Sequence, residues 1–152
     1  MRAAVVALAL IVGITSTAGA ASSKSCFRRS EAVADQAIRY TTEVMVMSDT
    51  CRNETYGQFA LRNRDALVHY QAALMERFRR TDGRRAQATL DTFMTHIANE
   101  AALRTGSQAI GQVCAVAVQF LATAASLAGD DFRHYAEHQA DEHGADYKLC
   151  KE

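Results

Sequence analysis

Proline is absent from all 152 positions of this chain, and this absence limits the folds that the chain can form. Sandwiches and barrels need many tight turns, in which proline and glycine are common. Here only eight glycines are available, and 49% of the residues are hydrophobic against 22% charged. This composition excludes collagen-like, low-complexity and strongly disordered chains. It favours an all-α fold in a single domain.

Residues 1–20 have the organisation of a secretory signal peptide. Arg2 supplies a positive start, residues 3–14 form an apolar run, and Ala18 and Ala20 give a small-x-small cleavage pattern. The apolar run is shorter than the roughly 20 residues needed to span a bilayer, which disfavours a membrane anchor. We therefore predict cleavage after residue 20. Residues 21–152 then form a single helical domain that is secreted, or periplasmic if the source is bacterial.

Five stretches of the chain repeat apolar residues at the three- and four-residue steps of an amphipathic helix. They cover residues 30–51, 56–78, 86–101, 110–127 and 132–150. Whether the third and fourth stretches join across Gly106 stays open at this point. The pattern predicts a bundle of four to five long amphipathic helices stapled by two disulfides.

The four cysteines are Cys26, Cys51, Cys114 and Cys150, and an even set behind a signal peptide predicts two disulfides. A helix over residues 30–51 is about 31 Å long, and the residues back to Cys26 recover only about 13 Å. A bond from Cys26 to Cys51 is therefore excluded. If the chain folds back at Gly106, Cys114 lies level with Cys26, which favours Cys26–Cys114 with Cys51–Cys150. The alternative is Cys26–Cys150 with Cys51–Cys114.

The sequence Asn53-Glu54-Thr55 is an N-glycosylation sequon in the predicted turn between the first two helices. An asparagine in such a turn is exposed. We predict a glycan at Asn53 if the chain is made in a eukaryotic secretory pathway, and none if the source is bacterial.

Seventeen basic residues balance seventeen acidic ones, so no global field points to nucleic acid or to an anionic membrane as partner. One dense basic patch could hold an anion or an acidic surface. It consists of Arg77, Arg79, Arg80, Arg84 and Arg85. Residues 52–85 carry eight basic and four acidic groups, whereas residues 130–152 carry three and seven. Internal pairing between the second and last helices is the preferred interpretation.

His134 and His138 lie one helical turn apart, an arrangement that can hold a divalent metal with a nearby carboxylate. Both histidines lie away from the apolar stripe of their helix, so they make at most a two-point site. We expect no cofactor. The sequence also lacks the nucleophile-elbow, zinc-protease, P-loop and dinucleotide-binding motifs, and we expect no enzymatic activity.

Residues 105–129 carry no charge, but Gln108, Gln112 and Gln119 argue against a membrane span. Small side chains in this helix either let neighbouring helices close in or leave a cavity. A carrier of small apolar ligands would need a cavity of about 300 Å³ or more. Its predicted lining is Phe93, Ile97, Ile110, Val113, Phe120 and Leu127. We expect instead that aromatic side chains fill this space, so that recognition uses the surface.

Four features of the chain can be compared with a known family: the run Ser25-Cys26-Phe27, the tyrosine-containing helix that leads to Cys51, the arginine-bearing helix after it, and the terminal Tyr147-Lys148-Leu149-Cys150. In these features the chain resembles the small secreted helical proteins of insects related to the tsetse EP N-terminal domain. The resemblance implies an extracellular, all-helical and non-enzymatic protein.

The residues themselves predict that the chain is a secreted helical binding or structural module, and that its partner is an extracellular protein or surface. Two alternatives stay open. One is a carrier of small hydrophobic ligands, and the other is a periplasmic metal-responsive or immunity-type helical protein.

Overall fold

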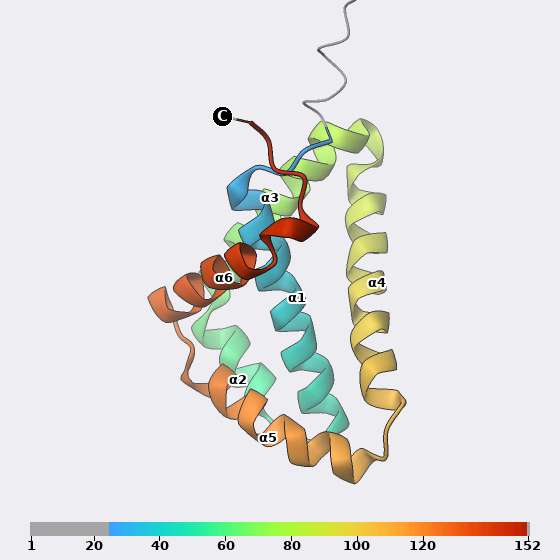
Figure 1. The fold of residues 1–152 in the computed structure, drawn as a ribbon, viewed down its shortest axis with the longest axis vertical. Coiled ribbons are helices and arrows are strands. Elements are labelled where there is room, and N and C mark those ends of the chain that lie inside the picture. The colour runs from blue at the N-terminus through green and yellow to red at the C-terminus, as the bar shows by residue number, and fades with distance from the viewer. Residues whose placement is uncertain (1–24, 152) are drawn as a thin grey trace, which may run out of the picture.

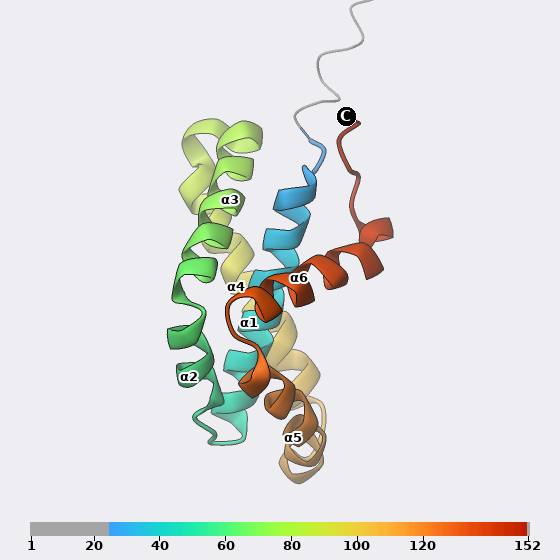
Figure 2. The same ribbon diagram turned by 90° about the vertical axis from the view of Figure 1, so that its left-hand side faces the viewer.

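The computed structural model describes residues 25–151, and the predicted signal peptide lies outside the described residues. The helices are α1 (Arg29–Thr50), α2 (Thr55–Arg62), α3 (Arg64–Asp82), η1 (Gly83–Arg85), α4 (Ala86–Gly106), α5 (Ile110–Ser126), α6 (Asp130–Glu142) and η2 (Gly144–Asp146). Helix α1 packs against each of the five other α-helices in this part of the chain. Helices α1, α3 and α4 run along the long axis, while α5 and α6 cross them (Figures 1 and 2). The all-α fold with two disulfides is confirmed.

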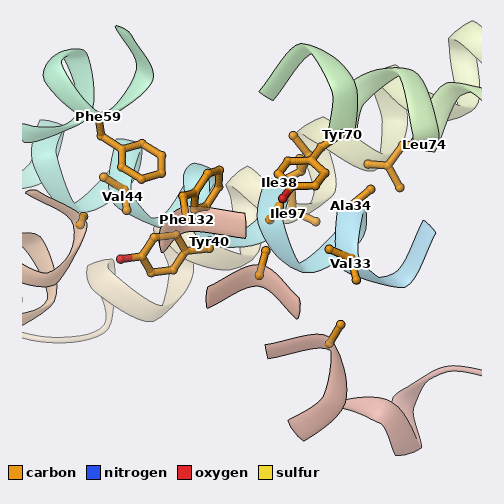
Figure 3. Close-up of a cluster of buried hydrophobic side chains, with 14 of the residues drawn as sticks. Val33, Ala34, Ile38, Tyr40, Val44, Phe59, Tyr70, Leu74, Ile97 and Phe132 are labelled. Carbon is orange, nitrogen blue, oxygen red and sulfur yellow. The ribbon is translucent and has the colours of Figure 1, made fainter. Parts of the chain in front are cut away.

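Aromatic rings from several helices fill the centre of the bundle around α1 (Figure 3). Phe59 of α2 and Phe132 of α6 are both fully buried, and their ring centroids lie 4.9 Å apart. Phe132 also lies 5.8 Å from the ring of Tyr70 in α3. Aromatic pairs at these separations add to the stabilisation from apolar burial. One side chain of α6 therefore ties that helix to both α2 and α3.

The prediction of one helix over residues 56–78 is wrong, because the chain bends at Asn63 between α2 and α3. The Asn63 side chain is buried and joins the bend to the turn between α5 and α6. Its Nδ2 donates to the carbonyl oxygens of Phe59 (3.0 Å) and Leu127 (3.1 Å), and its Oδ1 accepts from the amide of Gly129 (2.9 Å). Gly129 has φ +55°, a conformation that favours glycine. These partners are distant in sequence, so local periodicity could not reveal the bend.

Replacing Asn63 by alanine is expected to lower the free energy of unfolding by about 2 kcal/mol, because it removes a buried side chain that makes three hydrogen bonds and leaves the partly buried carbonyl of Leu127 and amide of Gly129 without this partner. The control is Asn53→Ala, which removes an exposed asparagine with one side-chain hydrogen bond, from the amide of Thr55, and the expected change is below about 1 kcal/mol. Urea denaturation followed by circular dichroism measures both values. Equal changes in the two variants would show that the buried contacts of Asn63 do not hold the bend.

The last predicted helix is too long, because α6 ends at Glu142 and the chain turns through η2. The residues after η2 are extended and pair with the segment before α1. The amide of Phe27 donates to the carbonyl oxygen of Lys148, and the amide of Cys150 donates to that of Phe27, both at 2.8 Å. This pairing brings Cys150 to the start of α1, at the end of the molecule where the described C-terminal residues lie (Figure 1).

The third and fourth predicted helices are separate, because α5 departs from the helical run that ends at Gly106 with a bend of 119°. Helix α5 crosses the molecule near the end of α1 instead of running back along it (Figure 1). Within residues 25–151, no single helix has both the length and the apolar character to cross a membrane. The run Arg64–Gly106 and helix α5, taken together as one bent pair, meet these criteria by length and composition only.

The favoured disulfide pairing is wrong, and the alternative is the one observed. Cys26 is bonded to Cys150 with a Cα–Cα distance of 4.9 Å, and Cys51 is bonded to Cys114 with a distance of 5.5 Å. The favoured pairing assumed that the chain folds back along the bundle at Gly106. Because α5 crosses near the end of α1, Cys114 meets Cys51. The exclusion of a bond from Cys26 to Cys51 is confirmed, and both disulfides indicate an extracellular or other oxidising environment.

Candidate functional site

A groove of about 750 Å³ lies between the C-terminal end of α1, the end of α4 and the start of α5. We name it the apolar groove. Its apolar walls are Met45, Val46, Tyr56, Gly57, Ala102, Gly106 and Ile110. Its polar lining residues are Ser48, Asp49, Thr50, Asn53, Thr105 and Gln108. Most of the exposed surface of the lining is apolar, which is typical of sites for small molecules.

The groove exists because α5 is held across the end of α1. The bend after Gly106 directs α5 away from α4, and the disulfide from Cys51 to Cys114 fixes α5 to the chain that leaves α1. The turn after α1 is closed by hydrogen bonds from the amide of Asn53 to the carbonyl oxygen of Ser48 (2.7 Å) and from the amide of Tyr56 to the Ser48 hydroxyl (3.1 Å). Two stretches far apart in sequence, residues 45–57 and 102–110, thus meet around one opening.

Asp49 is the one charged side chain among the described residues that line the apolar groove. The Ser48 hydroxyl accepts from the amide of Tyr56, and the Thr105 hydroxyl donates to the carbonyl oxygen of Ala102 at 2.9 Å. None of the described lining residues is a cation that could compensate the charge of a negative ligand. The groove therefore suits a molecule with an apolar body and a neutral or positive polar end.

The six residues of the predicted ligand cavity do not line one cavity, although four of them lie in or against the hydrophobic core: Phe93, Ile97, Phe120 and Leu127. Ile110 lines the apolar groove, whereas Ile97 and Phe120 line a second groove described below. Val113 is buried, with 4% of its surface exposed, and Phe93 and Leu127 pack against the core. The apolar groove lies instead at the end of the bundle, and its position follows from the bend at Gly106.

The five arginines of the predicted anion patch divide between two environments. Arg77 and Arg80 turn inward, where both lie near the buried Glu31 of α1 and each donates to the carbonyl oxygen of Cys26 at 3.2 Å. The others lie at the exposed end of α3 and in η1: Arg79, which pairs with Glu76, together with Arg84 and Arg85.

The inward arginines stabilise the start of α1. The guanidinium of Arg77 lies over the ring of Phe27 at 3.3 Å from its centroid, a cation–π contact. Burial lowers the pKa of Arg77, and the nearby Glu31 opposes this shift. The Glu31 carboxylate also accepts from the amide of Arg28 at 2.8 Å, which caps α1. Two arginines of the patch thus serve the fold.

The predicted ion pairing between the second and last helices is wrong in its partners, because both regions pair with α1. Arg77 and Arg80 pair with Glu31, and Asp141 of α6 pairs with Arg29, whose Nη2 lies 2.9 Å from Oδ2. Residues 52–85 do carry an excess of basic groups and residues 130–152 an excess of acidic groups. The opposite charges that pair with them lie on α1, which packs against both α3 and α6.

The predicted metal pair, His134 and His138, lies exposed on α6. The Nδ1 of His138 is 3.4 Å from a carboxylate oxygen of Glu142. Across residues 25–151, no group of three or more histidine, cysteine, aspartate or glutamate side chains is arranged to hold a metal ion. Asn53 of the sequon is exposed at the rim of the apolar groove, and its Oδ1 accepts from the amide of Thr55 at 2.7 Å.

A second groove, of about 530 Å³, lies between α1, α4, α6 and η2, and we name it the polar groove. At its wall, the buried carboxylate of Asp35 accepts from Arg39 Nε at 2.8 Å and from the Tyr147 hydroxyl at 2.6 Å. The Tyr147 oxygen accepts from Gln36 Nε2 at 2.6 Å. Burial, with the adjacent Asp35 carboxylate, raises the pKa of Tyr147.

Sequence reasoning missed the polar groove. The available signal was the four-residue spacing of Asp35, Arg39 and Glu43, which places these charges on one face of α1. That spacing is also typical of a solvated helix face. The contact with Tyr147, 112 residues from Asp35, cannot be read from the sequence.

Comparison of the chain with family models, characterised proteins and solved structures finds no match in any of the three, so the resemblance to the insect proteins stays a prediction.

Proposed function

We propose that this chain is a secreted, disulfide-stapled binding module that carries a small amphipathic molecule in the apolar groove. The observation that supports this function most directly is a groove of about 750 Å³ with mainly apolar walls and one charged lining residue, Asp49. Its volume falls within the range of about 300–1,000 Å³ that is usual for small-molecule sites.

The apolar walls favour a ligand with an aliphatic body. Each methylene that leaves water for an apolar wall contributes about 0.8 kcal/mol, which corresponds to about fourfold in affinity. Binding is therefore expected to strengthen along the series of linear alcohols until the groove is filled. The open side of the groove leaves the polar end of the ligand in water.

The charge of the groove selects the polar end. Asp49 repels a carboxylate, and no cation among the described lining residues offsets this repulsion. We therefore expect 1-decanol to bind at least about tenfold more tightly than decanoate, which has the same chain. Isothermal titration calorimetry at neutral pH measures both affinities. Asp49→Asn is expected to reduce the difference, and tighter binding of decanoate than of 1-decanol would contradict the assignment.

Two glycines offer a matched pair of variants for locating the ligand. Gly57 lines the apolar groove and Gly111 does not, and an added Cβ meets no atom within 4 Å at either position. Leucine favours the helix over glycine at both sites by several tenths of a kcal/mol or more, so about the same gain in stability is expected. Gly57→Leu is expected to weaken 1-decanol binding about tenfold, and Gly111→Leu to leave it unchanged. Equal affinities in the two variants would place the ligand elsewhere.

The proposal includes no catalytic step. Among the described residues that line the apolar groove, there is no histidine, cysteine or lysine. The Ser48 hydroxyl accepts a hydrogen bond from the amide of Tyr56, and among the described residues it makes no hydrogen bond to the carboxylate of its neighbour Asp49. A nucleophile needs a hydrogen-bonded base for activation, so binding alone is the function that these groups support.

Recognition of an extracellular protein or surface is the second candidate. Helix α5 carries no charge, and it exposes 74% of Val116 and 68% of Val118. Exposed apolar residues can take part in docking. These two side chains are two positions apart and so point to different sides of α5. They do not specify the chemistry of a partner, whereas the apolar groove does, and the groove therefore carries the proposal.

A further inference from the structure

The polar groove contains a cluster of aromatic rings that the proposed function does not use. Tyr40 of α1 and Tyr135 of α6 line it, and their ring centroids lie 4.5 Å apart. Phe120 of α5 also lines it, with its centroid 5.3 Å from that of Tyr40. The faces of aromatic rings carry partial negative charge and attract cations.

The charged lining of the polar groove has an excess of carboxylates over guanidinium groups. Four carboxylates line it, from Asp35, Glu43, Glu100 and Asp146, against the guanidinium groups of Arg39 and Arg104. Arg39 lies 2.8 Å from Asp35 and 3.2 Å from Glu100 and so serves two of them.

Glu43 is the carboxylate beside the rings. Its oxygen lies 3.7 Å from Arg104, which is longer than a hydrogen bond. The negative charge of Glu43 also raises the pKa of Tyr40 and of Tyr135, in both cases after the larger effect of burial. A loosely compensated carboxylate therefore acts on both rings of the aromatic pair.

Tyr40 adds a buried polar group that lacks a partner. Only 7% of Tyr40 is exposed, and its hydroxyl has no hydrogen-bond partner among the described residues. In Figure 3 this hydroxyl points away from the part of the core that contains Ala34 and Leu74. Buried hydroxyls are normally hydrogen-bonded, so an unpartnered one at the wall of a groove indicates a place for a ligand.

From these three features we propose that the polar groove binds an organic ammonium ion, held by the Tyr40 and Tyr135 rings, the Glu43 carboxylate and the Tyr40 hydroxyl. The ring faces and the carboxylate attract the positive charge. The hydroxyl oxygen accepts a hydrogen bond from a primary ammonium. This site is separate from the apolar groove and takes a different class of ligand.

Tyramine and tyrosol form a matched pair of probes, because they differ only in an ammonium group that replaces a hydroxyl. Calorimetry with the disulfide-bonded mature chain is expected to show saturable tyramine binding, and tyrosol at least about tenfold weaker. Absence of saturable tyramine binding, or equal affinity for the two probes, would overturn the proposal.

Substitution of Glu43 locates the site. Glu43→Gln keeps the shape of the side chain and removes its charge, and it is expected to weaken tyramine binding about tenfold. Tyr40→Phe keeps the ring and is expected to weaken it severalfold. Binding of 1-decanol to both variants is expected to equal that of the unsubstituted chain, which reports that they are folded.

Asp49→Asn distinguishes this site from the apolar groove, since Asp49 lines only the latter of the two grooves. Unchanged tyramine affinity in this variant supports the polar groove. A loss in Asp49→Asn with no loss in Glu43→Gln would place the ammonium in the apolar groove and overturn the proposal. Failure of 1-decanol to bind, with tyramine binding intact, would reject only the proposed carrier function.

Discussion

Replacing Cys51 and Cys114 together by alanine is expected to lower the free energy of unfolding by about 4 kcal/mol. The bond joins residues 63 positions apart, and its loss releases a long loop in the unfolded chain. A domain of this size is stable by only about 5–15 kcal/mol, so the loss is a large fraction of the total. The variant is also expected to bind 1-decanol at least about tenfold more weakly, because α5 loses its covalent tie at the apolar groove.

The control is the double variant at the other disulfide, Cys26→Ala with Cys150→Ala. That bond spans 124 positions, and its removal is expected to lower the stability by about 5 kcal/mol. It lies at the opposite end of α1 from the apolar groove, so the folded fraction is expected to keep its affinity for 1-decanol. Urea denaturation and calorimetry at low temperature separate the two effects. Unchanged 1-decanol affinity in Cys51→Ala with Cys114→Ala would show that the groove does not depend on this bond.

Replacing Glu31 by glutamine is expected to lower the free energy of unfolding by about 3 kcal/mol. Only 3% of Glu31 is exposed, and its carboxylate faces the guanidinium groups of Arg77 and Arg80, whose side chains are 14% and 18% exposed. Glutamine keeps the shape and one acceptor oxygen. It removes the negative charge that Glu31 supplies to two largely buried guanidinium groups, and loss of compensation for a buried charge is costly.

The matched control is Glu76→Gln, which removes the carboxylate of an exposed pair with Arg79 on α3. The expected change is below about 0.5 kcal/mol, because exposed ion pairs contribute little. Urea denaturation at neutral pH measures both variants. A change in Glu31→Gln no larger than that in Glu76→Gln would show that the inward arginines are not stabilised by this carboxylate.

Helix positions were predictable because the period of apolar residues is a local signal. The first helix was predicted over residues 30–51 and runs over Arg29–Thr50, and the fourth was predicted over 110–127 and runs over Ile110–Ser126. The bend at Asn63 was missed because its cause is tertiary, a set of hydrogen bonds to the chain around residues 127–129. The end of α6 was missed because extended pairing with Phe27 replaces the helix there.

The disulfide pairing depended on a single angle that the sequence did not contain. With the fourth helix folded back along the bundle, Cys114 would have reached Cys26. With the observed bend of 119°, α5 lies near the end of α1 and Cys114 reaches Cys51. The same bend creates the apolar groove. For this reason the predicted cavity residues, which assumed a packed bundle interior, contributed only Ile110 to that groove.

The central claim is that the apolar groove binds an amphipathic molecule, and backbone amide NMR of the mature, disulfide-bonded chain tests it most directly. Titration with 1-decanol is expected to shift amide resonances in residues 45–57, 102–108 and 110, which surround the groove. Resonances around Asp35 and Tyr147 in the polar groove are expected to stay in place. Shifts that concentrate outside the three segments, or no saturable shifts at all, would contradict the claim.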